Sequence, residues 1–199
     1  MNYPSNFHLY NYIIKRRCLL AKIFSVCASL FICILILALS TEQANSRDLI
    51  SEVKAAYIYN FTKFVNWAEE SDGSTKTSIK ICVIGTDPIG DILEELSYRQ
   101  VEGHPLKVEI YTSDISNLPR CQVLFICRSE EQQLPRILKQ LAGSNVLTAS
   151  DIPRFSKRGG MIGFVTEGGR VKIEINLRVA QQAGLKISAK LLEVSRIIQ

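Results

Sequence analysis

The segment IKICVIGTDPIG, residues 79–90, decides the fold of this chain. Its first half, Ile79–Ile84, is almost entirely apolar, which is typical of a strand buried on both faces of a sheet. Its second half is typical of a turn into a helix, because Asp87 suits the N-cap and Pro88 suits the first helical position. A buried strand that leads directly into a helix indicates the parallel sheet of an α/β protein.

Outward from this segment, strand and helix patterns alternate along the chain. The apolar spacing predicts strands over 106–111, 122–127 and 145–148, helices over 49–69, 88–96 and 129–141, and a short helix or turn over 113–118. A β-hairpin is predicted over 161–176, and one or two helices, interrupted at Gly184, from 177 onwards. We therefore predict an α/β fold, a three-layer sandwich with a mainly parallel central sheet plus a C-terminal β-hairpin.

Length and charge limit the kind of protein. The chain has 199 residues, 47% of them hydrophobic, which is enough for one globular domain with a core. Its net charge of +5 comes mostly from the first 40 residues, which hold four basic residues and no acid; the remainder carries 20 basic and 19 acidic residues. A nearly neutral domain without a basic stripe is a poor candidate for binding a polyanion, so we expect no nucleic-acid partner.

The N-terminus has the pattern of an export signal. Lys15-Arg-Arg17 precedes the uncharged run Ile23–Leu39, and Ala38-Leu-Ser40 offers a small-x-small cleavage site. We expect residues 1–40 to be a cleaved signal peptide, 41–78 an N-terminal helix and linker, and 79–199 the α/β remainder of the same domain. An uncleaved membrane anchor is the alternative, and either one places the domain outside the cytoplasm.

Three cysteines remain in the exported part: Cys82, Cys121 and Cys127. An odd number in an oxidising compartment suggests one disulfide and one free thiol. Cys82 and Cys121 lie in or beside two predicted neighbouring strands, so we favour a bond between them. Three buried, inert thiols are the alternative that the sequence leaves open.

The sequence offers no convincing catalytic set. The loop Gly85–Gly90 lacks the glycine and lysine positions of nucleotide-binding loops. The chain has only two histidines and no Cys-x-x-Cys, which argues against a metal site and a Ser-His-Asp triad. The acidic pairs Glu94-Glu95 and Glu130-Glu131 are expected on helix surfaces in water. We therefore expect no enzyme activity, no metal and no cofactor.

The loop from Ser150 to Gly160 is the first candidate for binding. It follows a predicted strand, so it lies at the edge of the sheet where ligand sites of α/β proteins form. Asp151, Arg154 and Arg158 offer polar and cationic groups there, which suits a carboxylate or phosphate. An ordinary solvated loop is the alternative.

Five other residues are candidates for ligand or partner binding. Asn176 ends the predicted hairpin, and Lys186 and Lys190 are expected to share one face of a C-terminal helix. Asn60 interrupts the apolar face of the first helix, and Trp67, the only tryptophan, lies near its end. Solvation of the lysines and core packing of the tryptophan are the alternatives.

Motifs throughout the domain resemble those of the YfiR/HmsC-like family of periplasmic regulators. The first helix, KAAYIYNFTKFVNW over residues 54–67, resembles the family's opening. Further matching motifs follow in the same order over 81–85, 124–126, 146–151, 159–164, 172–176 and 184–188. The resemblance covers roughly residues 50–195, and implies a single domain over about 49–197.

The resemblance implies a fold, a location and a function. Members are small exported α/β proteins with a disulfide at the positions of Cys82 and Cys121. Their best-understood role is to bind the periplasmic sensor region of an inner-membrane diguanylate cyclase and to hold it inactive, which lowers cyclic di-GMP and biofilm formation. An OmpA-like outer-membrane lipoprotein sequesters the regulator, and redox state or a small ligand tunes it.

Three hypotheses follow. The leading one is a periplasmic, non-catalytic regulator of a diguanylate cyclase. The second is a periplasmic receptor for a nucleotide or another anionic small molecule, bound near Asp151 and Arg158. The third is a thiol-disulfide enzyme, which the absence of Cys-x-x-Cys disfavours. Whether two copies form a homodimer is left open.

Overall fold

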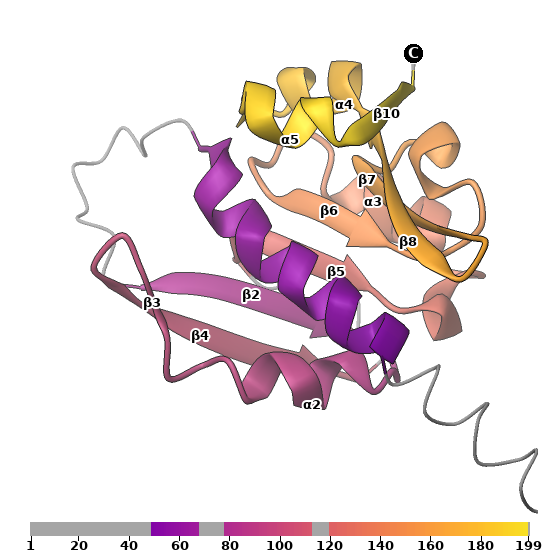
Figure 1. Ribbon diagram of the computed structural model, residues 1–199. Coiled ribbons are helices and arrows are strands. Elements are labelled where there is room, and N and C mark those ends of the chain that lie inside the picture. Colours follow the sequence, from indigo (N-terminus) through magenta and orange to yellow (C-terminus); the bar gives the residue numbers. More distant parts are fainter. Residues whose placement is uncertain (1–48, 68–77, 113–119, 199) are drawn as a thin grey trace, which may run out of the picture. The chain divides into compact units, whose positions relative to one another are not determined.

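The computed structural model describes residues 49–67, 78–112 and 120–198 (Figure 1). They belong to one compact unit, Asp48–Gln199. The expected signal peptide and the short helix or turn expected over 113–118 lie outside the described residues. Every helix in the described part of the chain is too short or too polar to span a bilayer.

An eight-stranded, mainly parallel sheet forms the centre of the unit. Its strand order is β10-β8-β7-β6-β5-β2-β4-β3, and only the β7–β8 and β3–β4 pairs are antiparallel. In chain order these strands are β2 (Ile79–Ile84), β3 (Gln100–Val101), β4 (His104–Tyr111), β5 (Val123–Ile126), β6 (Leu147–Ser150), β7 (Ile162–Glu167), β8 (Arg170–Asn176) and β10 (Ser195–Ile198). A separate antiparallel pair joins β1 (Val65–Asn66) to β9 (Lys186–Ile187).

Helices cover both faces of the sheet and complete the predicted three layers (Figure 1). One face packs against the first helix, residues 49–64, and against α2 (Ile89–Glu94), α4 (Leu177–Gln182) and α5 (Ala189–Glu193). The other face packs against α3 (Leu134–Gln140) and the segment around the 3-10 helix η2 (Phe155–Arg158). A second 3-10 helix, η1 (Arg128–Glu130), follows β5. The α/β sandwich predicted from the sequence is confirmed.

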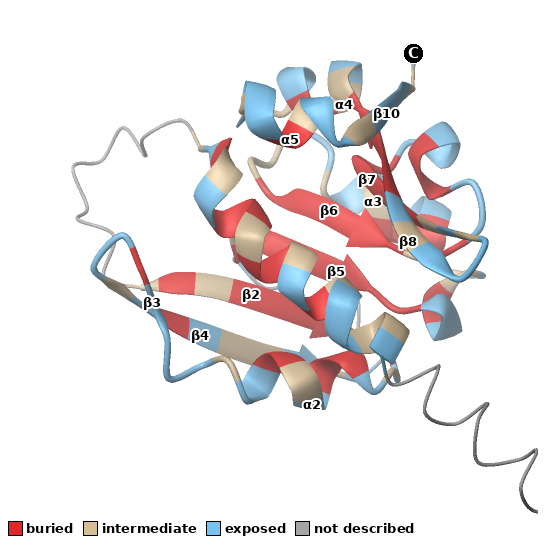
Figure 2. Cartoon of the chain, in the orientation of Figure 1, coloured by how far each residue is buried: buried red, intermediate tan, exposed pale blue. Residues whose placement is uncertain are grey.

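Alternation along the strands divides the core into two apolar layers. Ile81, Val83 and Phe125 pack toward the first helix, whereas Ile84 and Leu124 pack toward α3. Strands β2, β5 and β6 are almost wholly buried (Figure 2). Burial on both faces explains why these strands are continuous apolar runs in the sequence.

The first helix differs from its prediction in length and in buried face. It ends at residue 64, because Val65 and Asn66 turn into strand β1. Ala55, Ile58 and Phe61 are its fully buried apolar residues, while Val53, which the helical spacing with Tyr57 predicts on the buried face, is 36% exposed. The face that packs on the sheet is therefore the one that carries Ala55, Ile58 and Phe61.

The C-terminal region contains strands where helices were predicted. After α4, Gly184 takes a positive φ of 76° and the chain enters β9, and α5 is followed by β10. Strand β10 pairs in parallel with β8 and forms the sheet edge outside the hairpin. The hairpin itself, β7–β8, is confirmed, but it is not at the edge.

Three predicted elements are displaced or only partly correct. The strand predicted over 145–148 is β6, two residues later, and the helix predicted over 129–141 is split into η1 and α3. Ile110, which the alternation with Leu106 and Val108 predicts to point inward, is 40% exposed, because β4 lies near the sheet edge.

Candidate functional site

The carboxyl ends of β2 and β5 mark the crevice where an α/β sheet most often binds a ligand. After β2 the chain continues to β4 on one side and later to β5 on the other, so the strand order reverses there. Gly85 follows β2 with φ +100°, and a Cβ there would lie 2.4 Å from Ser129 Oγ and 2.9 Å from Cys127 Cβ. Ser129 Oγ also accepts a hydrogen bond from the Thr86 backbone N–H at 3.0 Å. Gly85 is therefore packed directly against the segment that follows β5, with no space for a side chain of its own.

Acidic side chains gather at the same edge of the sheet. Asp87 Oδ1 accepts from the Ile89 N–H at 2.9 Å, but Pro88 is the N-cap of α2, so the predicted cap is displaced by one residue. Burial, and secondarily the charge of Asp151, raises the pKa of the Asp87 carboxyl; the Ile89 N–H and Lys54 oppose this. Glu130 is only 3% exposed and accepts from Gln133 Nε2 at 3.2 Å. The expectation that Glu130 is a solvated surface acid is wrong.

Asp151 lies at this edge, but an ion pair within the chain already uses it. Lys54 Nζ of the first helix donates to Asp151 Oδ2 at 2.5 Å, and the two side chains are 12% and 17% exposed. The other oxygen, Oδ1, is buried and has no hydrogen-bond partner among the described residues. The pair ties the first helix to the end of β6.

The two arginines of the same loop do not join Asp151 in one cleft. Arg158 Nη1 donates to Glu131 Oε1 at 2.8 Å, on the segment that follows η1. Arg154 is exposed and precedes η2 in the left-handed region, with φ 61°. The three residues predicted to bind an anion thus face separate partners or solvent.

Asn176 has a structural position beneath this loop. Its Oδ1 accepts from the Val179 N–H at 3.2 Å and caps α4, while its Nδ2 donates to the Ser156 carbonyl oxygen at 2.9 Å. It therefore fixes the loop and the helix relative to each other, and it is 7% exposed.

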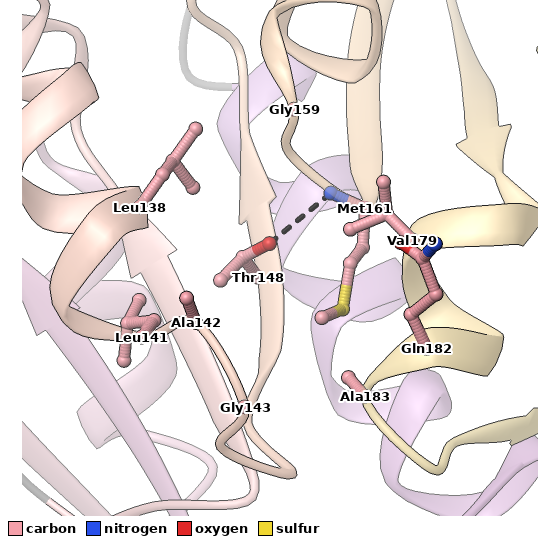
Figure 3. A pocket seen from close by; sticks show the side chains of 10 residues that line it. All are labelled: Leu138, Leu141, Ala142, Gly143, Thr148, Gly159, Met161, Val179, Gln182 and Ala183. Atoms are coloured by element: carbon pink, nitrogen blue, oxygen red, sulfur yellow. Dashed lines mark hydrogen bonds between the residues drawn. The ribbon is translucent and has the colours of Figure 1, made fainter.

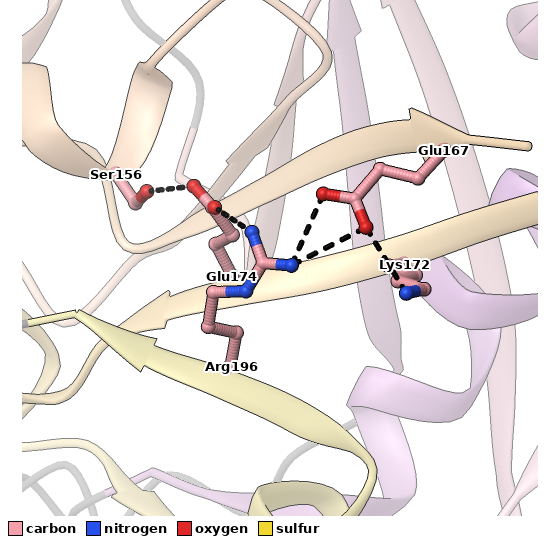
Figure 4. Close-up of polar contacts among 5 residues, drawn as sticks. All are labelled: Ser156, Glu167, Lys172, Glu174 and Arg196. Carbon is pink, nitrogen blue, oxygen red and sulfur yellow. Dashed lines mark hydrogen bonds and ion pairs between the residues drawn. The ribbon is translucent and has the colours of Figure 1, made fainter.

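An ion-pair network around Glu174, its one mostly buried charged member, was not predicted from the sequence (Figure 4). Glu174 accepts from Ser156 Oγ at 3.1 Å and from Arg196 Nη1 at 3.0 Å. Arg196 also reaches Glu167 at 3.0 Å, and Lys172, followed by Arg196, lowers the pKa of the Glu167 carboxyl. The available signal was a glutamate between two isoleucines, in Lys172-Ile-Glu-Ile-Asn176. The network joins β10 to the hairpin.

The remaining predicted residues lie in different places. Lys186 is in β9 and Lys190 is in α5, so the prediction that they share one helix face is wrong, because Gly184 and the Ser188 N-cap interrupt the helix. Trp67 lies just after β1, donates from Nε1 to the Gln122 carbonyl oxygen at 3.2 Å and packs against the core. Asn60 lines a groove on the first helix.

The three cysteines of the domain are all buried thiols. Cys82 and Cys121 belong to the apolar layer under α3, and their side chains are hydrogen-bonded to each other. That hydrogen bond and burial raise the pKa of the Cys82 thiol far above its ordinary value. Cys127 belongs to the opposite layer, where burial and the charges of Asp87, Asp151 and Glu130 raise its thiol pKa. A bond between Cys82 and Cys121 stays a prediction, and their adjacency is compatible with it.

A small cavity of about 210 Å³ opens between the end of α3 and α4 (Figure 3). Leu138 and Leu141 lie on one side, and Met161 and Val179 on the other. Thr148 Oγ1 accepts from the Met161 N–H at 3.1 Å at its floor. It is smaller than most pockets for small molecules.

The described residues contain no group of three or more His, Cys, Asp or Glu side chains placed to hold a metal.

In comparison with known proteins, the model of the YfiR/HmsC-like family matches residues 51–196. No curated protein matches the chain. The match extends from the first helix to β10.

Proposed function

Because this chain belongs to the YfiR/HmsC-like family, we propose that it represses an inner-membrane diguanylate cyclase by binding its periplasmic sensor region. The family consists of periplasmic regulators of diguanylate cyclase signalling, and its known role is regulatory rather than catalytic. The family match over residues 51–196 is the single observation that carries the proposal. A regulator of this kind acts by binding one state of its partner more tightly than the other.

Two features of the structure support a docking role without catalysis. Ser129 and Cys127 pack directly against Gly85, and the loop Gly85–Gly90 lacks the glycine and lysine positions of nucleotide-binding loops. The thiols of Cys82 and Cys127 have pKa values raised by their surroundings, which disfavours the nucleophilic thiolate that a thiol-disulfide enzyme needs.

The proposal includes export and a covalent link. Residues 1–40 act as a cleaved signal peptide, and a single domain over about 49–197 works in the periplasm. There, Cys82 and Cys121 form a disulfide that closes a loop of about 40 residues and stabilises the domain by about 3–4 kcal/mol. An OmpA-like outer-membrane lipoprotein competes with the cyclase for the regulator.

Deletion of the gene tests the proposal. In a cell that has a periplasm-facing diguanylate cyclase, we expect the deletion to raise cyclic di-GMP and surface attachment, and the full chain to restore both. A chain without residues 1–40 is the matched control, because it stays in the cytoplasm and should fail to restore them. Unchanged cyclic di-GMP in the deletion, or full restoration by the cytoplasmic control, would contradict the proposal.

The alternative of an anion receptor at Asp151 and Arg158 is less well supported. Both side chains are paired within the chain, with Lys54 and Glu131. An incoming anion would have to displace a carboxylate from Arg158 and would meet the charge of Asp151. The geometry around this loop therefore favours the regulator over a receptor at this position.

A further inference from the structure

A groove on the first helix has the features of a ligand site and is not used by the function proposed above. It has a volume of about 360 Å³, within the usual range for small-molecule pockets. Ala55 and Ala56 of the first helix and Ile92 and Leu96 of the α2 region form apolar walls. Asn60 is the predicted site residue that lies in it.

Two cations flank one aromatic ring at the end of this groove. Lys63 Nζ lies 4.3 Å from the centre of the Tyr59 ring, and Arg99 Cζ lies 5.5 Å from it. The Tyr59 hydroxyl donates to the Gln100 carbonyl oxygen at 3.4 Å, and the residue is 8% exposed, so the ring is held in place. Cation–π attraction places both charges beside the groove.

Among the described residues, neither of these two cations has a carboxylate partner. No acidic side chain of the described residues lies within ion-pairing distance of Lys63 or Arg99. By contrast, Lys54, nine residues before Lys63 on the same helix, is paired with Asp151. An anion at this end of the groove would gain charge-assisted hydrogen bonds from Lys63 or Arg99.

The other end of the groove has the opposite sign. Glu52 lines the groove and lies eleven residues before Lys63. Eleven residues of helix correspond to about 16 Å. A ligand with negative charge at both ends would be repelled by Glu52, so the arrangement favours a single anionic group at the Lys63 and Arg99 end.

We propose that this groove binds a small organic anion with an apolar body. Its carboxylate or phosphate lies at the end of the groove that Lys63 and Arg99 line, its apolar body packs on Ala56, Ile92 and Leu96, and the Asn60 amide offers a further hydrogen bond. The site is independent of the proposed repression of a cyclase, and each can fail without the other.

Calorimetric titration of the protein purified from the cell envelope tests the site. The probe is 2-naphthoate, a planar aromatic monoanion, and the matched uncharged probe is 2-naphthamide. We expect saturable binding of one naphthoate per chain, and binding of the amide at least tenfold weaker. No saturable binding of naphthoate up to 10 mM, or equal binding of the two probes, would overturn the proposal.

Variants locate the binding. The double variant Lys63→Gln and Arg99→Gln should weaken naphthoate binding at least tenfold. The matched control is Arg136→Gln and Lys139→Gln, which removes two cations from α3 and should leave binding unchanged. Circular dichroism verifies that both variants are folded. If both double variants lose binding equally, the attraction is a general effect of net charge and the site is wrong.

A third variant tests the apolar wall. Ala56 is exposed on the groove side of the first helix, so Ala56→Trp should fill the groove and abolish naphthoate binding without loss of folding. Unchanged affinity in Ala56→Trp would overturn the assignment of the groove. Binding of an acidic peptide to Lys63 and Arg99 without any binding of naphthoate would also overturn the proposal, because it would assign the groove to a protein partner.

Discussion

The two faces of the central sheet bury cysteines in opposite settings. On the α3 face, Cys82 and Cys121 lie in contact within an apolar layer. On the face of the first helix, Cys127 lies at the end of β5, close to the charges of Asp87, Asp151 and Glu130. Burial is equally complete for Cys82 and Cys127, so the strand parity of each residue decides which thiols can meet. The comparison shows that the α3 face holds two thiols that can form a disulfide, while on the other face Cys127 packs against Gly85 at the carboxyl end of β2.

The largest expected effect concerns that disulfide. In protein taken from the cell envelope, we expect reduction to lower the free energy of unfolding by about 4 kcal/mol, because it reopens a loop of about 40 residues in the unfolded chain. Cys82→Ser or Cys121→Ser should abolish this sensitivity to reductant, and Cys127→Ala should keep it. Denaturant unfolding with and without dithiothreitol measures it. If Cys127→Ala abolished the sensitivity to reductant, the assignment of the three cysteines to the two faces of the sheet would be wrong.

The second effect concerns the close packing around Gly85. Gly85→Ala should lower stability by about 3 kcal/mol, since the new Cβ is strained and collides with Ser129 and Cys127. Gly143→Ala is the matched control, because Gly143 also has a positive φ but has no atom within 4 Å of an added Cβ. It should cost about 1 kcal/mol. Equal losses in urea unfolding would contradict the close packing of Ser129 and Cys127 against Gly85.

The third effect concerns the ion pair that joins the first helix to β6. Lys54→Met should lower stability by about 2 kcal/mol, since it leaves the charge of Asp151 mostly buried without a partner. The double variant with Asp151→Asn should recover part of the loss. Lys172→Met breaks an exposed pair with Glu167 and should change urea unfolding little. An unchanged free energy of unfolding in Lys54→Met would show that the Lys54–Asp151 pair does not stabilise the contact of the first helix with β6.

Most of the fold was predictable, because local apolar patterns in the sequence indicate the strands and helices that form the core. The run Ile79–Ile84 is long and continuous, and it is a buried strand in the structure. Strand β10 was not predictable in this way, because Ser195–Ile198 follows a short helix and becomes a strand only by pairing with β8. Lys186 and Lys190 were misplaced for the same reason: β9 exists through its pairing with β1.

The candidate sites were less predictable than the fold. Asp151 and Arg158 have the residue types of an anion site, but their partners, Lys54 and Glu131, are distant in sequence. The burial of Glu130 depends on the packing of η1 against Gly85. The hydrophobic pattern of the sequence does not indicate this contact. Asn60 was singled out by a break in an apolar face, and only the structure places Lys63 and Arg99 beside it around Tyr59.

The smallest expected effect concerns the acidic edge. The pKa of Asp87 is raised, so its charged form disfavours folding, and wild-type stability gains as pH falls through that raised pKa. Asp87→Asn keeps an oxygen for the Ile89 N–H and removes the charge. We expect it to be more stable than the wild type at pH 7 by about 0.5 kcal/mol or less, and the difference to vanish below pH about 4. A difference that grows on acidification would contradict the assignment of Asp87.

The central claim is that this chain acts by docking to a diguanylate cyclase. The most direct test is affinity capture with the exported protein from detergent-solubilised membranes of its own cell, with captured proteins identified by mass spectrometry and compared between Cys82→Ser and wild type. The account predicts that wild-type protein captures an inner-membrane diguanylate cyclase with a periplasmic region. Recovery of every such cyclase in the unbound fraction would contradict it.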